Sequence, residues 1–375
     1  MEQFDKAVFD DAPTSWASAN DGSLSSLHQL SPYIGKLKPQ IARDLIAEYT
    51  SAGETVVDPF CGSGSIPLEA KMAGRNVVAA DISPYAYLLT KAKLCPPATR
   101  EHAHINFERT LCASMELPIP VLADVPPWVR EFFHPRTLSD AIRFADVCIA
   151  RKDHFLLSCF LGVLHHQRPG FLSYPSSHLV PYLRDKKFPR DQFPEMYEYR
   201  ELAPRIRAKI DRAFKTSPRP LSSSSVVVRR SDIRRLELKS QVDAIITSPP
   251  YMNALDYRRD NRLRLWFLDR ATQDYSPEPT DKRAGLESMV NELVSKAQSS
   301  VRIGGKVILV VGETVVRKRI KSHPSQAFAE ALNHTGEFSL LDAIRDNIPD
   351  IRRARRDYQG TKTEHILVFE KRRLC

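Results

Sequence analysis

The stretch Thr55-Val-Val-Asp-Pro-Phe-Cys-Gly-Ser-Gly64 joins a short β-branched run to a glycine loop. β-Branched residues favour strands, and glycines directly after a strand let the backbone turn tightly and approach a ligand. A segment expected to be helical runs on to Gly74, and Asn76-Val-Val-Ala-Ala-Asp81 is a second strand-like run. Strand, glycine turn, helix and strand make a right-handed βαβ unit of a parallel sheet. This unit predicts an α/β fold.

Regular patterns continue on both sides of this unit. Upstream, apolar residues at helical spacing predict a helix over 38–50. Downstream, the run 306–311 follows an expected turn at Gly304-Gly305, and 338–343 and 364–369 are expected to form a closing pair of strands. The strand patterns of this part of the chain are 225–229, 242–247, 306–311, 338–343 and 364–369.

Between about 96 and 220 the chain has no strand pattern. Helices are expected there over 137–151, 153–166 and 195–215, followed by a Ser/Pro-rich linker at 216–225. The simplest arrangement is one doubly wound sheet interrupted by a mostly helical insert. The expected divisions are 1–95 and 225–375 for the two parts of the sheet domain and 96–224 for the insert.

Composition excludes several classes of protein. Of 375 residues 42% are hydrophobic and 27% charged, which is typical of a globular protein rather than a disordered or membrane protein. No apolar run approaches 18 residues, and the acidic N-terminus lacks the apolar run of a signal peptide, so we expect a cytoplasmic protein. The six cysteines include no CxxC pair, and adjacent His165 and His166 point apart on a helix, so we expect no metal.

The charge is unevenly distributed. Residues 127–240 carry 22 Lys and Arg against 12 Asp and Glu, whereas residues 1–126 carry 10 against 15. A segregated basic block is typical of proteins that bind phosphate-rich partners, because neutralising phosphates releases counterions. A solvated basic surface is the other interpretation, and charge alone does not separate the two.

The glycine loop and the following acidic strand end are candidates for cofactor binding. Asp81 lies 23 positions after Asp58, which suits a carboxylate that accepts the ribose hydroxyls of an adenosine-containing cofactor. No third glycine follows Gly64, so a pyrophosphate-binding dehydrogenase is disfavoured. A merely structural glycine turn remains open at this point.

A second candidate stretch is Thr247-Ser-Pro-Pro-Tyr251, at the carboxyl end of an expected strand. Ligands of open α/β sheets bind beyond the carboxyl ends of the strands. The Ser248 hydroxyl and a proline-fixed carbonyl can accept hydrogen bonds from an exocyclic amine, and the Tyr251 ring offers a stacking face for a flipped base. The alternative is a plain Pro-Pro exit from a strand.

Together, 56–64 (VVDPFCGSG), 78–84 (VAADISP) and 244–251 (AIITSPPY) resemble the amino-methyltransferases that use S-adenosylmethionine on DNA bases. The segments 31–39 and 301–307 are similar to further elements of this family, and the resemblance covers about 25–95 and 225–371. It implies a class I methyltransferase fold with a seven-stranded sheet, S-adenosyl-L-methionine as cofactor and DNA as substrate.

The resemblance also implies roles for individual residues. Asp232 matches the position that contacts the adenine amino group, although an ordinary helix-capping aspartate is an equal alternative. The residues implied in holding the target base are Ser248, Pro249, Pro250 and Tyr251. The residues implied in cofactor binding are Tyr33, Lys36, Asp58, Phe60, Gly62, Gly64, Asp81 and Asp232.

An exocyclic base amine is a poor nucleophile because its lone pair is delocalised into the ring. Accepting its hydrogens at Ser248 and the Pro249 carbonyl would localise that lone pair, so positioning supplies most of the acceleration. Carbon-5 methylation of cytosine would need a Pro-Cys nucleophile, but this chain has only Cys95-Pro96. In the family a serine at this position favours cytosine N4. Adenine N6, an RNA amine and a catalytically silent binder are the alternatives.

The basic insert separates the cofactor loop from the Ser-Pro-Pro-Tyr motif, as a target-recognition region does in the family. A lid that packs without reading DNA is the alternative. The enzyme would then recognise a short site in duplex DNA and could protect it from a partner restriction endonuclease. The residues expected to contact DNA are Arg184, Lys186, Lys187 and Arg190 in the insert, and Arg258, Arg259 and Arg262 after the motif. Surface salt bridges to Asp256 and Asp260 are an equal alternative for the last three.

Overall fold

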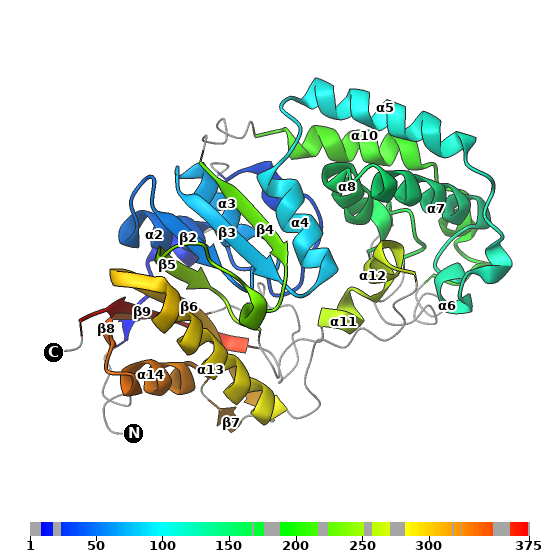
Figure 1. Ribbon diagram of the computed structural model, residues 1–375. Coiled ribbons are helices and arrows are strands. Elements are labelled where there is room, and N and C mark those ends of the chain that lie inside the picture. The colour runs from blue at the N-terminus through cyan, green and yellow to red at the C-terminus, as the bar shows by residue number, and fades with distance from the viewer. Residues whose placement is uncertain are drawn as a thin grey trace.

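The computed structural model describes residues 9–17, 24–166, 169–175, 188–216, 224–250, 257–270, 282–316, 319–322, 324–347 and 361–373 (Figure 1). Its centre is a mixed sheet with the strand order β1-β8-β9-β6-β5-β2-β3-β4, and β7 pairs with β6. The strands are β1 (Asp10–Asp11), β2 (Thr55–Asp58), β3 (Asn76–Asp81), β4 (Val226–Arg230), β5 (Val242–Thr247), β6 (Val301–Val316), β7 (Arg319–Ser322), β8 (Phe338–Asn347) and β9 (Thr361–Lys371).

The predicted α/β class is confirmed. Strands β2 to β6 run parallel in the order β6-β5-β2-β3-β4, and β9 pairs antiparallel with both β6 and β8. These seven strands form the predicted seven-stranded sheet, including the closing pair β8 and β9. The two-residue β1 and the four-residue β7 are short additions at its margin.

The expected turn at Gly304-Gly305 is wrong. Both glycines lie inside β6, where the register against β5 shifts between Val242 and Ala244. Gly304 has φ +78°, and a Cβ on Gly305 would lie 2.7 Å from the carbonyl oxygen of Asp243. The glycines therefore allow an irregularity within a continuous strand, because only they fit this close approach.

Helices cover both faces of the sheet (Figure 1). Alternate strand residues point to opposite faces, so Val56 joins the core under α2 (Pro39–Tyr49), α3 (Ser65–Met72) and α4 (Pro84–Leu94). Val57 joins the core under α13 (Lys282–Ser300) and α14 (Pro324–His334). The remaining short elements are α1 (Thr14–Ala17), η1 (Ser26–Gln29), η4 (Ile233–Arg235), α11 (Tyr257–Asp260) and α12 (Arg262–Leu268).

Between α4 and β4, every element in the described part of the chain is helical. These elements are α5 (Arg100–Glu116), η2 (Leu122–Asp124), α6 (Pro127–Arg130), α7 (Pro135–Ala150), α8 (His154–Leu164), η3 (Pro194–Tyr197) and α10 (Leu202–Ala213). The single helix expected over 195–215 is instead η3 followed by α10. Phe107, Phe144 and Phe160 of the insert belong to the same buried cluster as Val56, and α8 contacts α4, so the insert packs against the sheet domain through α4 (Figure 1). The predicted domain boundaries stay a prediction.

Among the described helices, none is both long and apolar enough to cross a membrane.

Candidate active site

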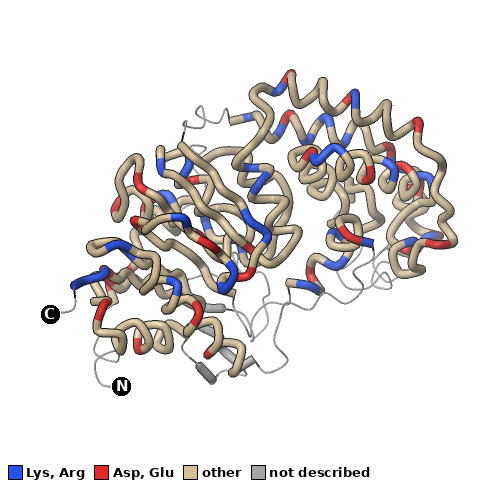
Figure 2. The backbone as a smooth tube through the Cα atoms, in the orientation of Figure 1, with Lys and Arg blue, Asp and Glu red and all other residues tan. Residues whose placement is uncertain are grey.

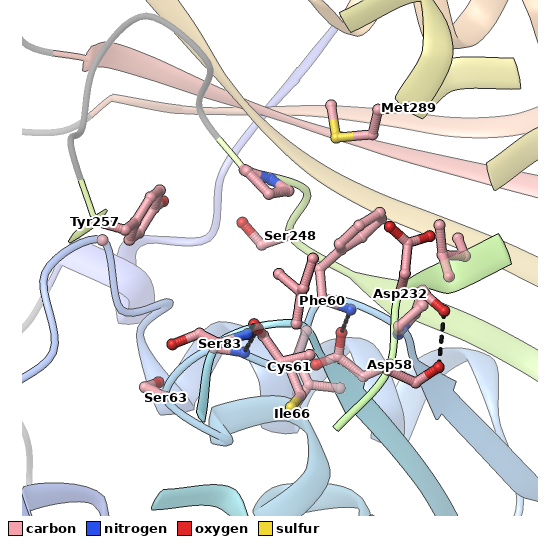
Figure 3. Close-up of a pocket in the computed structure, with 18 of the residues that line it drawn as sticks. Asp58, Phe60, Cys61, Ser63, Ile66, Ser83, Asp232, Ser248, Tyr257 and Met289 are labelled. Carbon is pink, nitrogen blue, oxygen red and sulfur yellow. Dashed lines mark hydrogen bonds between the residues drawn. The ribbon is translucent and has the colours of Figure 1, made fainter. Parts of the chain in front are cut away.

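A cavity of about 330 Å³ lies where the carboxyl ends of β2, β3 and β5 meet the start of η4 and the side of α13 (Figure 3). The predicted residues that line it are Tyr33, Asp58, Phe60, Gly62, Asp81, Asp232, Ser248 and Pro250. The fold therefore brings the glycine loop and the start of the Ser-Pro-Pro motif to one cavity, although about 185 residues separate them in the sequence.

The glycine loop between β2 and α3 is shaped by its glycines and by α4. Gly62 and Gly64 have φ +46° and +73°, and a Cβ on Gly64 would lie 2.7 Å from the Thr90 hydroxyl on α4. Thr90 also donates to the Cys61 sulfur at 3.3 Å. Burial raises the pKa of the Cys61 thiol well above its usual value, which keeps it protonated and unreactive. Cys61 therefore packs rather than acts as a nucleophile.

Asp81 ends β3 with both carboxylate oxygens directed at backbone groups. Oδ2 accepts from the Gly62 N–H at 2.9 Å and Oδ1 from the Ser83 N–H at 2.8 Å. Burial raises the pKa of Asp81 to about 6 in spite of these bonds. A carboxylate oxygen has two lone pairs, so each can accept a further hydroxyl, as two ribose hydroxyls would require.

Asp58 ends β2 and is 3% exposed. Its Oδ1 accepts from the Thr247 hydroxyl at 2.7 Å. The same oxygen accepts from the Phe60 N–H at 3.2 Å (Figure 3). Burial is the largest influence and raises the pKa of Asp58 to about 7. A cationic ligand beside this carboxyl would favour its ionised form.

Thr247 was not among the predicted site residues. Its hydroxyl joins β5 to β2 directly before Ser248, and so it fixes the motif against the glycine loop. The α13 wall of the cavity, formed by Gly285, Ser288, Met289 and Glu292, was also missed. No local sequence pattern predicts the Thr247–Asp58 hydrogen bond or the α13 wall, because both depend on contacts between distant segments.

Asp232 caps the N-terminus of η4, accepting the Arg234 N–H at 2.9 Å. Its two oxygens also accept from the Arg234 guanidinium, each at 2.9 Å, which lowers the pKa of Asp232. The geometry shows the capping role that the sequence left open, on a residue that also lines the cavity.

Of the two upstream candidates, Tyr33 lines the cavity and Lys36 does not. Tyr33 lies over Gly62, with its ring 5.8 Å from that of Tyr85 and 6.2 Å from that of Tyr257. The Lys36 ammonium donates to the carbonyl of His28 at 2.6 Å, and Lys36 is not among the residues that line the cavity.

The Ser-Pro-Pro motif follows β5 into the cavity. Ser248 and Pro250 line it and Pro249 is buried, whereas Tyr251 lies outside the described residues. Tyr257, on α11, lines the wall that faces Ser248 (Figure 3). An aromatic ring and a serine hydroxyl therefore stand at one end of the cavity.

The basic candidates are partly described. Arg184, Lys186 and Lys187 lie outside the described residues, as does the side chain of Arg259. Arg190 lies over the ring of Tyr197 at 4.6 Å, and Arg262 lies over the ring of Trp128 at 3.9 Å. Arg258 is half-buried on α11.

Acidic and basic residues are interspersed on the described helices of the insert (Figure 2). No group of three His, Cys, Asp or Glu side chains in the described part of the chain could hold a metal ion.

Comparison with known proteins identifies the family that the N-terminal part resembles. A family model described as DNA methylase, of the N6/N4 type, matches residues 15–92. The chain is 34% identical over 68 residues to Type II methyltransferase M.MjaII of Methanocaldococcus jannaschii, which is 18% of this chain and 13% of that protein. It is 21% identical over 361 residues to Type II methyltransferase M.MvaI of Kocuria varians, covering 87% of this chain and 72% of that protein. A 51-residue segment is 43% identical to tRNA (guanine(10)-N2)-dimethyltransferase of Methanothermobacter thermautotrophicus, 13% of this chain and 15% of that protein.

These matches confirm the resemblance to the DNA amino-methyltransferases, and the family-model match includes the glycine loop and Asp81. S-Adenosyl-L-methionine is the cofactor that this resemblance assigns. The cavity fits it: the backbone of Gly62 lines it, Asp81 can take hydroxyls, and Phe60, Ile233 and Met289 offer apolar walls. The predicted Gly64 does not line the cavity and faces Thr90 on α4 instead.

Proposed function

We propose that this chain, which matches the DNA methylases over residues 15–92, transfers a methyl group from S-adenosyl-L-methionine to the exocyclic amine of a DNA base, cytosine N4 in the first place. The observation that carries the proposal is the shared cavity: Ser248 and Pro250 line the same space as Gly62 and Asp81. A cofactor site alone would suit many reactions. The polar motif beside it suits an amine acceptor.

The cofactor would be held by the glycine loop and by two carboxylates. Asp81 would accept the ribose hydroxyls while keeping its bonds to the backbone of the loop. Asp58 would lie near the positively charged amino acid end, and ionisation of Asp58 would strengthen that contact. When bound, S-adenosyl-L-methionine supplies an electrophilic methyl group on a sulfonium.

The acceptor would be held by the motif. The Ser248 hydroxyl and the Pro249 carbonyl would accept the two amine hydrogens, which localises the nitrogen lone pair towards the methyl group. The Tyr251 ring would stack on the base, and Tyr257 closes the same end of the cavity. The target base would have to leave the duplex, because its amine is otherwise paired.

The insert would contact the DNA around the flipped base. Arg258 lies on α11, next to Tyr257 in the cavity wall, and Arg262 joins α12 to α6 of the insert through Trp128. We place DNA-backbone contacts at Arg258 and at Arg190 of the insert. A restriction-modification role, with a partner endonuclease, follows only if the recognised sequence is short and specific.

A second candidate acceptor is an amine in RNA. It is favoured by the 43% identity to the tRNA (guanine(10)-N2)-dimethyltransferase over 51 residues. The larger span of the match to M.MvaI ranks DNA first.

Substitution of Ser248 tests the proposal. Ser248→Ala should lower methyl transfer to unmethylated DNA by about a hundredfold, as loss of a positioned hydrogen-bond partner does, while the Kd for S-adenosylmethionine stays unchanged. Ser295→Ala, at an exposed serine of α13 outside the cavity, is the matched control and should keep both. Equal activity of the two variants would contradict the role of the motif.

A further inference from the structure

A second cavity, of about 580 Å³, opens at the other end of α4 from the candidate active site. Ser83, the N-cap of α4, lines the first cavity, and Cys95, its C-cap, lines the second. The 11-residue helix spans roughly 16 Å, so the two cavities are separate. The second is lined by the segment after α4, by α5 and by the turn between α7 and α8.

The described lining of this cavity is strongly basic. Arg109 comes from α5, and Arg151, Lys152 and His154 come from the α7–α8 turn. The only carboxylate in the lining is Asp153, which caps α8 by accepting the Leu156 N–H at 2.9 Å.

The cations of the cavity outnumber its one described carboxylate, Asp153. Arg151 donates to the Thr110 hydroxyl at 3.4 Å. The side chains of Arg109 and Lys152 have no hydrogen bond or ion pair to any residue that the structure describes. Burial is the main cause of the lowered pKa of His154, Lys91 and Lys152 lower it further, and Asp153 opposes them.

The turn that carries Lys152 is the ordinary end of α7. Lys152 has φ +54°, and it is the single non-glycine residue with positive φ in the described chain. Its N–H donates to the Ile149 carbonyl at 3.0 Å, and the Asp153 N–H donates to the Cys148 carbonyl at 2.9 Å. These two bonds form a Schellman motif, which ends the helix and fixes the backbone of Lys152 next to Arg151.

We propose that this cavity binds a phosphate group through Arg109, Arg151 and Lys152. Two planar guanidiniums and an ammonium suit the oxygens of a phosphate, and the volume admits a diphosphate. The phosphate belongs either to a nucleic-acid backbone or to a small free phosphate compound. The proposal does not depend on the methyl-transfer function, because the site shares no residue with the first cavity.

Calorimetric titration of the full chain with sodium pyrophosphate tests the site. Arg109→Gln and Lys152→Gln should each weaken pyrophosphate binding at least tenfold. Arg100→Gln, which removes one charge from the same helix α5 outside the cavity, should leave it unchanged. Thermal melting of each variant shows whether the fold is kept, and only variants that melt like the wild type are compared.

The source of the phosphate is tested with duplex DNA at several salt concentrations. If the phosphate is part of DNA, Arg109→Gln should lower the slope of log K against log salt by about 0.9, whereas Arg100→Gln should not. If it is a free phosphate compound, the slope stays as in the wild type and only pyrophosphate binding is lost. The proposal is overturned if Arg109→Gln and Lys152→Gln leave both pyrophosphate binding and DNA binding unchanged. It is also overturned if Arg100→Gln changes pyrophosphate binding and DNA binding as strongly as those two variants do.

Discussion

The sheet and the helical insert use buried charge in opposite ways. At the ends of β2 and β3 the charged groups are carboxylates, the buried Asp58 and the half-buried Asp81, which accept backbone N–H groups. In and around the insert they are cations, Arg200, Arg264 and Lys209, which donate to backbone carbonyls. The carboxylates keep free lone pairs for a ligand, whereas the guanidinium donors are largely taken up by the fold.

Arg200 shows how fully the fold can use the hydrogen-bond donors of a buried cation. The Arg200 guanidinium donates to the carbonyls of Phe171, Ser173 and Met196 at 2.6, 3.1 and 2.8 Å. Such a side chain joins η3 to the segment 171–173 and offers little to a partner. The number of basic residues in the insert sequence is therefore larger than the number of basic side chains available to DNA.

The largest expected effect lies at the contact between the insert and α12. Arg264, which is 3% exposed, donates to the carbonyls of Leu161 and His165 at 3.2 and 3.0 Å and so fixes α12 to the end of α8. Arg264→Met should lower the free energy of unfolding by about 3 kcal/mol, because two buried carbonyls lose their donor. Urea denaturation measures it, with Arg258→Met as the control on the half-buried α11. A loss below about 0.5 kcal/mol would show that this contact does not hold the two regions together.

The next effect lies in the sheet. Asp81→Asn should weaken S-adenosylmethionine at least tenfold in calorimetry, since the amide offers one acceptor oxygen where the carboxylate offers two. Asp232→Asn is the comparison, because the Arg234 guanidinium already occupies both oxygens of Asp232. A larger loss for Asp232→Asn than for Asp81→Asn would reverse the assignment of the two carboxylates.

The strand patterns and the glycine loop were predictable because they are local. The run 242–247 is β5 to the residue, and the loop after β2 turns at the glycines that the sequence marks. The bond from Thr247 to Asp58 joins residues 189 apart, and the direction of the Lys36 ammonium depends on the fold around it. No periodicity or spacing encodes such contacts, so these parts of the site emerged only from the structure.

The third expected effect depends on the ionisation of Asp58 and Asp81. Burial raises the pKa of Asp58 to about 7 and that of Asp81 to about 6, and a cationic cofactor favours the ionised forms. Affinity for S-adenosylmethionine should therefore rise with pH from 5 to 7.5 and then level off, by up to about tenfold per pH unit for each group. Asp58→Asn should remove the part of the rise near pH 7. A flat profile would mean that neither carboxylate meets positive charge.

The smallest effect concerns the insert cations. Burial lowers the pKa of Lys209 from 10.5 to about 8, so between these values the unfolded chain binds more protons than the folded one. The contribution of Lys209 to stability therefore rises as pH increases from 8 to about 10. Urea denaturation across this range should show the rise, and Lys209→Met should reduce it. A fall in the free energy of unfolding from pH 8 to 10 in the wild type, with the same fall in Lys209→Met, would contradict this prediction.

The most direct measurement of the central proposal is mass spectrometry of nucleosides. Unmethylated DNA is incubated with the protein and methyl-deuterated S-adenosylmethionine, digested and scanned for labelled products. We expect labelled N4-methyl-2′-deoxycytidine, lost in Ser248→Ala and kept in Ser295→Ala. Labelled N6-methyladenine would retain the mechanism and overturn the cytosine assignment. Label in RNA with none in DNA would contradict the proposed substrate, and label in neither, across DNA of diverse sequence, would contradict the proposed reaction.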